Sequence, residues 1–142
     1  MHFLILLFSA NLFSAIPECN YLGGQMLSRE SKLSYNREEC QGQLVLFLKD
    51  HSKDKAGVII HHHNVRKLTG KERMEDTYIC YKKGHPEKSE FFYGIFDFAK
   101  SGTVVKGPGK LVAAWTANEK TRKIEPLDQK YLDEILCQEE VE

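Results

Sequence analysis

The chain has 142 residues, and its 20 Lys and Arg side chains are balanced by 20 Asp and Glu side chains. Binding to nucleic acid or to an anionic membrane surface needs a clustered excess of basic residues, so neither partner is expected. With 42% hydrophobic residues and four prolines, the composition excludes a long disordered tail, collagen and a coiled coil. The length fits one small globular domain.

Residues 1–15 have the pattern of a signal peptide. Their apolar run, residues 3–8, is far shorter than the roughly 20 apolar residues that a membrane-spanning helix needs. We therefore expect export to a secreted or periplasmic location, with no stable membrane anchor after cleavage. The cleavage point stays open between Ser14 and Pro17, and residues 16–142 are expected to form a single domain.

The four cysteines, Cys19, Cys40, Cys80 and Cys137, are even in number and widely spaced. Disulfides form and persist in the oxidising compartments that exported proteins enter, so we expect two bridges. No pair has the short spacing of a zinc ribbon. Four cysteines allow three pairings, among which the sequence does not decide. We expect Cys19 to pair with Cys40, and Cys80 with Cys137, the second bridge tying a strand to the last helix.

The segment that follows the first cysteine has a helix-like spacing. Met26, Leu33 and Cys40 recur at seven-residue intervals, which would place them on one face of a helix. The sequence therefore predicts an N-terminal helix over residues 25–40, although its serines and its asparagine lower the helix propensity.

Strand patterns dominate the rest of the chain. In chain order, apolar, β-branched and aromatic runs predict strands at residues 44–48, 57–65, 77–81, 91–98, 103–106, 110–117 and 121–125. The spacer at 50–56 is expected to close an antiparallel hairpin, and a charged loop is expected at 67–76. Because the connections are too short for helical crossovers, we expect antiparallel pairing.

The segment 91–98 is the candidate for the central strand. In extended form it places Phe92, Phe96 and Phe98 on one side and Phe91, Tyr93 and Ile95 on the other. Both faces are apolar, as in a strand that is covered on two sides. We therefore expect Phe96 to be almost wholly buried.

The chain ends in a helix pattern. Asp128 has the position of an N-cap, and Leu127 and Leu132 have those of a hydrophobic staple. Leu132, Ile135 and Leu136 would form the buried stripe of this helix. The predicted fold class is thus α+β: one small domain with a mostly antiparallel sheet of six or seven strands, a C-terminal helix and the N-terminal helix.

A histidine cluster, residues 61–63, lies in the second predicted strand. A strand would place His61 and His63 on one face and His62 on the other, and a pair at that spacing can bind zinc or copper loosely. The candidates for the required third ligand are His51, His85 and a carboxylate such as Asp97. More often, such a strand is half-exposed, and its histidines alternate between solvent and the sheet without binding a metal.

Other chemistry finds little support in the sequence. There is no Gly-x-Ser-x-Gly motif, and the adjacent carboxylates lie in hydrophilic runs that are usually surface. The glycines at 102–109 precede a strand rather than a helix, so they indicate a turn and no phosphate site. We therefore expect no catalytic residues, no enzyme activity, and no cofactor other than zinc or copper at His61 and His63.

An apolar ligand groove is a further hypothesis. Trp115 has small alanine neighbours that would leave room for a guest. The aromatic residues that could line such a groove are Phe91, Phe92, Tyr93, Phe96, Phe98 and Trp115. Core packing is the commoner fate of aromatic residues in a chain of this size.

The leading functional prediction is an exported, disulfide-stabilised binding domain without catalysis. It would act on an unidentified protein or envelope partner, for example as an inhibitor. The alternatives are a metal-binding protein or small metalloenzyme that uses His61 and His63, and a carrier of a small apolar ligand that uses Trp115.

Overall fold

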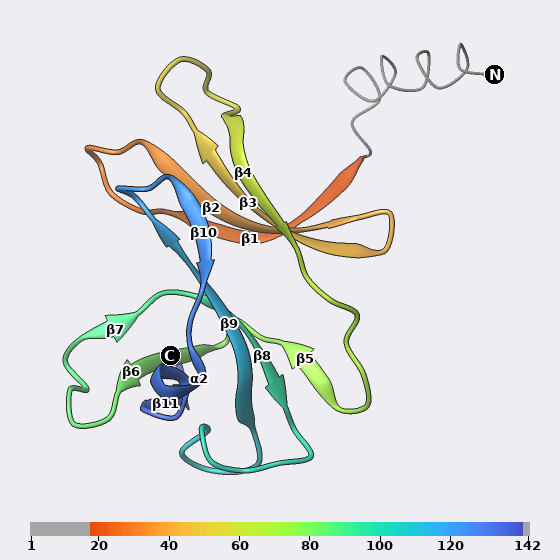
Figure 1. The fold of residues 1–142 in the computed structure, drawn as a ribbon, viewed down its shortest axis with the longest axis vertical. Coiled ribbons are helices and arrows are strands. Elements are labelled where there is room, and N and C mark those ends of the chain that lie inside the picture. The colour runs from red at the N-terminus through yellow and green to blue at the C-terminus, as the bar shows by residue number, and fades with distance from the viewer. Residues whose placement is uncertain (1–17, 141–142) are drawn as a thin grey trace.

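The computed structural model describes residues 18–140, and in that range the chain is almost entirely β-structure (Figure 1). It forms eleven strands and one four-residue helix. The predicted α+β class is therefore wrong, as is the expected count of six or seven strands. The strand pairing is antiparallel in all three sheets, as predicted. The predicted signal peptide, residues 1–15, lies outside the described residues.

Sheet A contains the first four strands in the order β1-β2-β3-β4. They are β1 (Cys19–Met26), β2 (Leu33–Cys40), β3 (Gln43–Asp50) and β4 (Val58–Asn64). Between β2 and β3, Gln41 and Gly42 have φ values of 52° and 80°, and positive φ at both central residues is the geometry of a type I′ hairpin. The predicted strands at 44–48 and 57–65, and the hairpin between them, are confirmed.

The helix predicted over residues 25–40 is wrong, because this segment forms the end of β1, a turn, and β2. Leu33 and Tyr35 are completely buried, whereas Ser34 and Asn36 point to the opposite face of the sheet. This alternation with period two is the pattern of a strand. Because β2 pairs with β1 on one side and with β3 on the other, the segment adopts the two-residue period of a strand and not the period of a helix.

Sheets B and C contain the rest of the strands. Sheet B has the order β10-β9-β8-β5 and sheet C the order β11-β6-β7. The strands are β5 (Glu72–Met74), β6 (Tyr78–Lys82), β7 (Ser89–Glu90), β8 (Tyr93–Asp97), β9 (Lys110–Asn118), β10 (Lys123–Pro126) and β11 (Ile135–Glu139). The strands predicted at 77–81, 91–98, 110–117 and 121–125 correspond to β6, β8, β9 and β10. The strand predicted at 103–106 is reduced to one bridge, between Val104 and Cys137.

Strand β5 lies inside the segment 67–76, which the sequence predicts to be a charged loop. The strand was not predicted because one of its buried residues, Glu72, is charged. The two oxygens of Glu72 accept hydrogen bonds from the Arg66 guanidinium at 2.7 and 2.8 Å. The backbone N–H of Thr69 donates a further bond at 2.9 Å. These donors, Arg66 foremost, lower the pKa of Glu72 to about 2. A charged residue can therefore occupy an inward position on a short edge strand.

The prediction of a C-terminal helix is wrong beyond the first helical turn. Asp128 does cap α2 (Gln129–Leu132), accepting a hydrogen bond from the Tyr131 N–H at 2.8 Å. The chain then continues as β11, because Ile135 and Cys137 alternate into the interior, 1% and 0% exposed. A single helical turn has little stability of its own, so the pairing of β11 with β6 determines this end of the chain.

Two disulfides join residues that lie directly opposite each other in antiparallel pairs. Cys19–Cys40 links β1 to β2 and Cys80–Cys137 links β6 to β11, with Cα atoms 4.2 and 4.1 Å apart. The expected pairing is confirmed, except that the second bridge ties a strand to a strand and not to a helix. Disulfides of this kind indicate an oxidising compartment.

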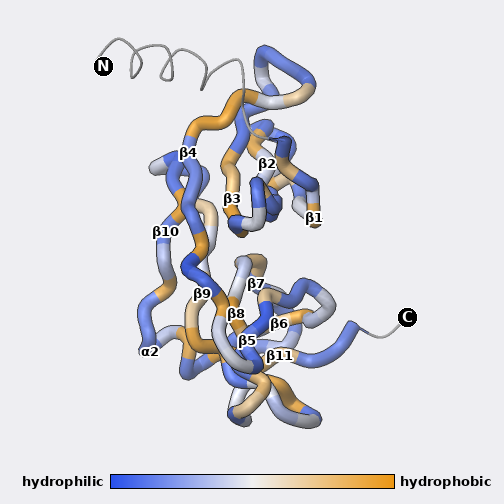
Figure 2. Tube along the Cα trace, turned by 90° about the vertical axis from the view of Figure 1, so that its right-hand side faces the viewer, coloured by the Kyte–Doolittle hydropathy of each residue, from blue (hydrophilic) through white to orange (hydrophobic). Residues whose placement is uncertain are grey.

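Strand β8 contributes to two separate hydrophobic cores. Tyr93 and Ile95 belong to the core shared with sheet A, whereas Phe96 belongs to the core shared with sheet C. In the view of Figure 2, sheet A lies at the top and sheet C at the bottom, with β9 and β10 running between. The prediction of a central strand covered on both faces is confirmed, and Phe96 is 1% exposed.

Two buried tyrosines connect sheet A to sheet B. The Tyr35 hydroxyl donates to the Trp115 carbonyl at 2.7 Å, and the Tyr93 hydroxyl lies 3.2 Å from the carbonyls of both Tyr35 and Gly23. The two rings meet edge to face with centroids 4.8 Å apart. Burial raises the pKa of both hydroxyls, so both remain protonated donors.

We predict that Phe96→Ala will destabilise the protein by about 3 to 5 kcal/mol, because it removes a ring from a packed interior. Thermal unfolding followed by circular dichroism measures the change. Val105→Ala is the control, since Val105 is 48% exposed and should change stability by less than about 0.5 kcal/mol. A thermal midpoint of Phe96→Ala within a degree or two of the parent's would contradict the two-core arrangement.

We predict that Tyr35→Phe will cost about 1 to 3 kcal/mol in urea unfolding, because the Trp115 carbonyl loses a buried hydrogen-bond donor. The matched control is Tyr21→Phe, which removes the same hydroxyl from a residue that is 63% exposed. Equal stabilities of the two variants would show that the Tyr35 hydroxyl does not hold the sheets together.

Candidate functional site

The histidines of β4 lie on the faces that the sequence predicts, and each has a structural contact. The Nδ1 atom of His61 accepts a hydrogen bond from the Ile124 N–H at 2.9 Å. On the same face, the His63 ring lies 4.8 Å from the Trp115 ring. His62 faces the other way, with its ring 6.3 Å from that of Phe47. The His61 side chain therefore connects β4 to the backbone of β10, although the two strands belong to different sheets.

The candidate third ligands are engaged elsewhere. His51 uses both ring nitrogens, one with the Ser34 hydroxyl at 2.6 Å and one with the Lys55 carbonyl at 2.8 Å. Asp97 accepts a hydrogen bond from the backbone of Ala99, and His85 lies on the exposed surface 3.6 Å from Glu87. Residues 18–140 contain no group of three or more His, Cys, Asp and Glu side chains placed to hold a metal ion. The zinc or copper site at His61 and His63 stays a prediction.

Trp115 is part of the core between sheets A and B. It is 9% exposed, and it packs with Tyr93, Ile95 and Ile124 in the same cluster. The indole contacts the His63 ring, and its own backbone carbonyl holds the Tyr35 hydroxyl. Trp115 does not line the cleft at the junction of the three sheets, whose aromatic residues are Tyr78, Phe91, Phe92 and Phe96.

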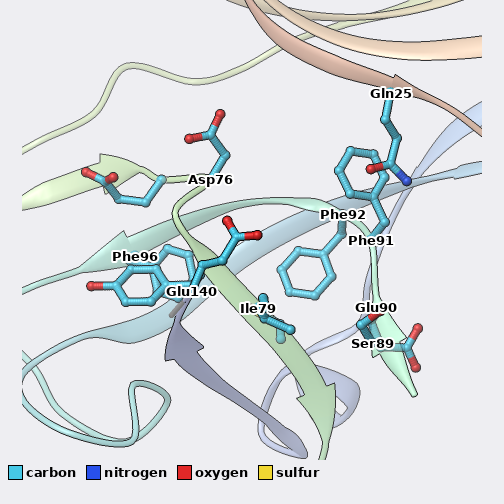
Figure 3. A pocket seen from close by; sticks show the side chains of 12 residues that line it. Gln25, Asp76, Ile79, Ser89, Glu90, Phe91, Phe92, Phe96 and Glu140 are labelled. Carbon is cyan, nitrogen blue, oxygen red and sulfur yellow. The ribbon is translucent and has the colours of Figure 1, made fainter. Parts of the chain in front are cut away.

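A cleft of about 330 Å³ lies where the three sheets meet (Figure 3). Its apolar part is formed by Ile79, Phe91, Phe92 and Phe96, and its rim carries Glu75, Asp76, Glu90 and Glu140. Ligand sites in proteins occupy roughly 300 to 1,000 Å³ and combine an apolar lining with a few polar groups. The size and lining of this cleft agree with that description.

Each sheet supplies one side of the cleft. Ile79 comes from β6 in sheet C, Phe96 from β8 in sheet B, and Gln25 from β1 in sheet A. Phe91 and Phe92 occupy the connection from β7 to β8, and Cys80 stands opposite Glu90 in the β6–β7 pair. In Figure 3, Gln25 reaches from sheet A toward the two phenylalanine rings. The disulfide at Cys80 anchors the wall that carries Ile79.

The rings that form the floor of the cleft pack against other aromatic rings. The Phe91 ring contacts Tyr35 at 5.8 Å and Tyr93 at 5.3 Å between centroids. The Phe96 ring lies 5.3 Å from that of Tyr78. Phe92 has no such ring partner among the described residues and is half-buried, so it is the ring most available to a ligand.

Two of the four rim carboxylates are already paired. Asp76 lies 3.1 Å from the Arg37 guanidinium, and Glu90 accepts a 2.7 Å hydrogen bond from the Tyr131 hydroxyl. Burial, and then the bond to Glu90, raise the pKa of Tyr131 to about 12. Burial also raises the pKa of Tyr78, and the charges of Glu139 and Glu75 add to that effect. Carboxylates therefore lie close to both tyrosine hydroxyls at this part of the surface.

The sequence anticipated only part of this site. Phe91, Phe92 and Phe96 were among the candidate groove residues, since their clustering in one segment is visible in the sequence. Gln25, Glu75 and Glu140 were missed, because they come from distant parts of the chain and resemble ordinary surface residues. No local pattern distinguishes them from the other acidic residues in hydrophilic runs.

Comparison of the chain with protein-family models, curated proteins and solved structures gives no significant match. Residues 18–140 contain no helix with the length and apolar character needed to cross a membrane. Neither the comparisons nor the described residues give a positive sign of catalytic activity. The functional interpretation therefore depends on the geometry of the cleft and on the disulfides.

His63 gives the fold a pH dependence. Burial lowers its pKa, and the neighbouring charges of His61 and His62 lower it further. Below the ordinary histidine value of about 6.5, the unfolded chain therefore binds more protons at this position than the native state does. Stability is consequently lost as the pH falls through that value.

We predict that the thermal midpoint of the parent will fall more steeply between pH 7.5 and pH 5.5 than that of His63→Phe. Differential scanning calorimetry in buffers of matched ionic strength measures both slopes. His85→Phe is the control, because His85 is exposed. If His63→Phe retains the full slope of the parent, protonation of His63 does not destabilise the fold.

Proposed function

We propose that the protein is an exported binding domain, secreted or periplasmic, that holds a small amphiphilic ligand in the cleft where its three sheets meet. The observation that carries this proposal is the cleft itself, whose half-buried Phe91 and Phe92 rings lie beside a polar rim, with Phe91 packed against two buried tyrosines. The two disulfides support an extracellular or periplasmic setting.

The role of the fold in this function is to keep the cleft open before a ligand arrives. Phe91 and Phe96 are fixed by aromatic neighbours, and the Cys80–Cys137 bridge fixes β6 against β11. A preorganised site loses less side-chain freedom on binding than one that must order itself. Burial of a ligand's apolar part against Phe92 then supplies the favourable free energy.

We predict that the neutral fluorescent probe Nile red will bind to the parent and that Phe92→Ala will weaken this binding about tenfold, a loss of about 1.4 kcal/mol. Fluorescence titration measures the affinity, and amide shifts in nuclear magnetic resonance spectra locate the probe. We expect the shifts to cluster at residues 75–80 and 89–92.

The matched control is Tyr21→Ala, which removes an exposed aromatic ring outside the cleft. It should bind the probe as the parent does. If Phe92→Ala binds unchanged, or if the shifts cluster elsewhere, the cleft is not the ligand site.

A second candidate is recognition of a protein partner through β1. Tyr21, Leu22 and Met26 on this edge strand are 63%, 41% and 52% exposed, and exposed apolar side chains grouped on one element are typical of interaction surfaces. Chemical cross-linking in the native secreted fluid tests this candidate. A partner lost on Tyr21→Ser with Met26→Ser, yet retained on Phe92→Ala, would assign it to β1 and separate it from the cleft.

A further inference from the structure

The rim of the cleft carries acidic side chains, and no basic side chain lines the cleft beside them. Four of its twelve lining residues are Asp or Glu, and none of the twelve, all within residues 18–140, is Lys, Arg or His. The whole chain carries equal numbers of acidic and basic residues. The excess of carboxylates here is therefore a local property of the cleft and does not reflect the composition of the chain.

Two of these four carboxylates have no partner among residues 18–140. Asp76 is paired with Arg37 and Glu90 with the Tyr131 hydroxyl. For Glu75 and Glu140, by contrast, no hydrogen bond or ion pair of the carboxylate occurs within the described part of the chain. In the view of Figure 3, the Glu140 carboxylate lies between the Phe96 and Phe92 rings. A ligand that enters the cleft would meet this charge beside an aromatic floor.

Aromatic rings and carboxylates attract the same kind of group. The face of a phenyl ring carries partial negative charge and binds an ammonium group within about 6 Å of its centroid, and a nearby carboxylate adds Coulombic attraction. Conversely, a neutral ligand seated in the cleft would remove water from Glu75 and Glu140 without replacing it, which is unfavourable. The lining thus favours a cation over a neutral molecule of the same shape.

We infer that the ligand of this cleft is an organic amine, an ammonium group on an apolar or aromatic body, and that Glu75 and Glu140 select its charge. This inference rests on the proposed function, since it names the ligand class of the same cleft. The apolar body lies against Phe92 and Ile79, and the ammonium group lies toward Glu140. The acidic side chains of residues 18–140 form no group of three or more placed to hold a metal ion, so the inference is drawn for an organic cation.

The test compares two probes of equal shape. One is 3-phenylpropyltrimethylammonium, and the other is its neutral isostere, in which a quaternary carbon replaces the nitrogen. Isothermal titration to the parent should show the cation binding about tenfold more tightly than the isostere. The double variant Glu75→Gln with Glu140→Gln should lose that preference while its affinity for the neutral isostere stays the same or rises.

The matched control is the double variant Glu30→Gln with Glu39→Gln, which makes the same change of net charge at exposed residues outside the cleft. It should keep the preference for the cation. If this control loses the preference to the same extent, long-range attraction by net charge explains the selectivity and the inference fails.

The outcomes separate this inference from the proposed function. If both probes bind equally to the parent, and Phe92→Ala weakens both, the cleft is a ligand site but does not select charge, and the inference is overturned. If neither probe binds with any dependence on Phe92, the proposed function fails together with the inference. A double glutamine variant that loses both probes equally also overturns the inference, because the carboxylates would then act only on the shape of the cleft.

Discussion

The hydroxyl groups of two buried tyrosines fix how sheet A packs on sheet B, and the rest of the molecule depends on that packing. A buried hydroxyl without a partner is costly. Tyr35 therefore requires the Trp115 carbonyl at its position, and Tyr93 requires a carbonyl of sheet A. Hydrophobic contacts alone tolerate sliding of one sheet over another, whereas these directional bonds do not. They give the interface one register, and the ring of Phe91 packs against both tyrosines.

The cleft follows from this arrangement. Because β8 is covered on both faces, its Phe96 side meets sheet C while its Tyr93 side meets sheet A. The cleft opens where the three sheets approach one another, so its floor is the back of two packed cores and its rim consists of strand ends. A packed apolar floor beside a charged rim matches the proposed ligand, which is apolar at one end and charged at the other.

The strands that the sequence predicts correctly are those whose residues favour β-structure over several positions, such as β3, β8 and β9. Errors arise where two periods compete. Met26, Leu33 and Cys40 fit a helical face, but Leu33 and Tyr35 also alternate, and only pairing with two neighbouring strands favours the extended form. The same competition explains the end of the chain, where Ile135 and Cys137 follow a capped helical turn. Propensity is a weak local preference that tertiary contacts override.

By itself, the sequence determined the pairing of extended segments as antiparallel and the burial of both faces of residues 93–96 within the segment 91–98. It also determined the faces taken by His61 and His63, and an expected cysteine pairing that the fold confirms. Most of these properties depend on residues that are neighbours in the sequence, and the cysteine pairing had only three possibilities. Only the tertiary structure decided the membership of the cleft, in which Gln25, Phe92 and Glu140 meet. The physical reason is that non-local strand pairing brings distant segments together, and a carboxylate in a hydrophilic run carries no local sign of the neighbours that it will acquire.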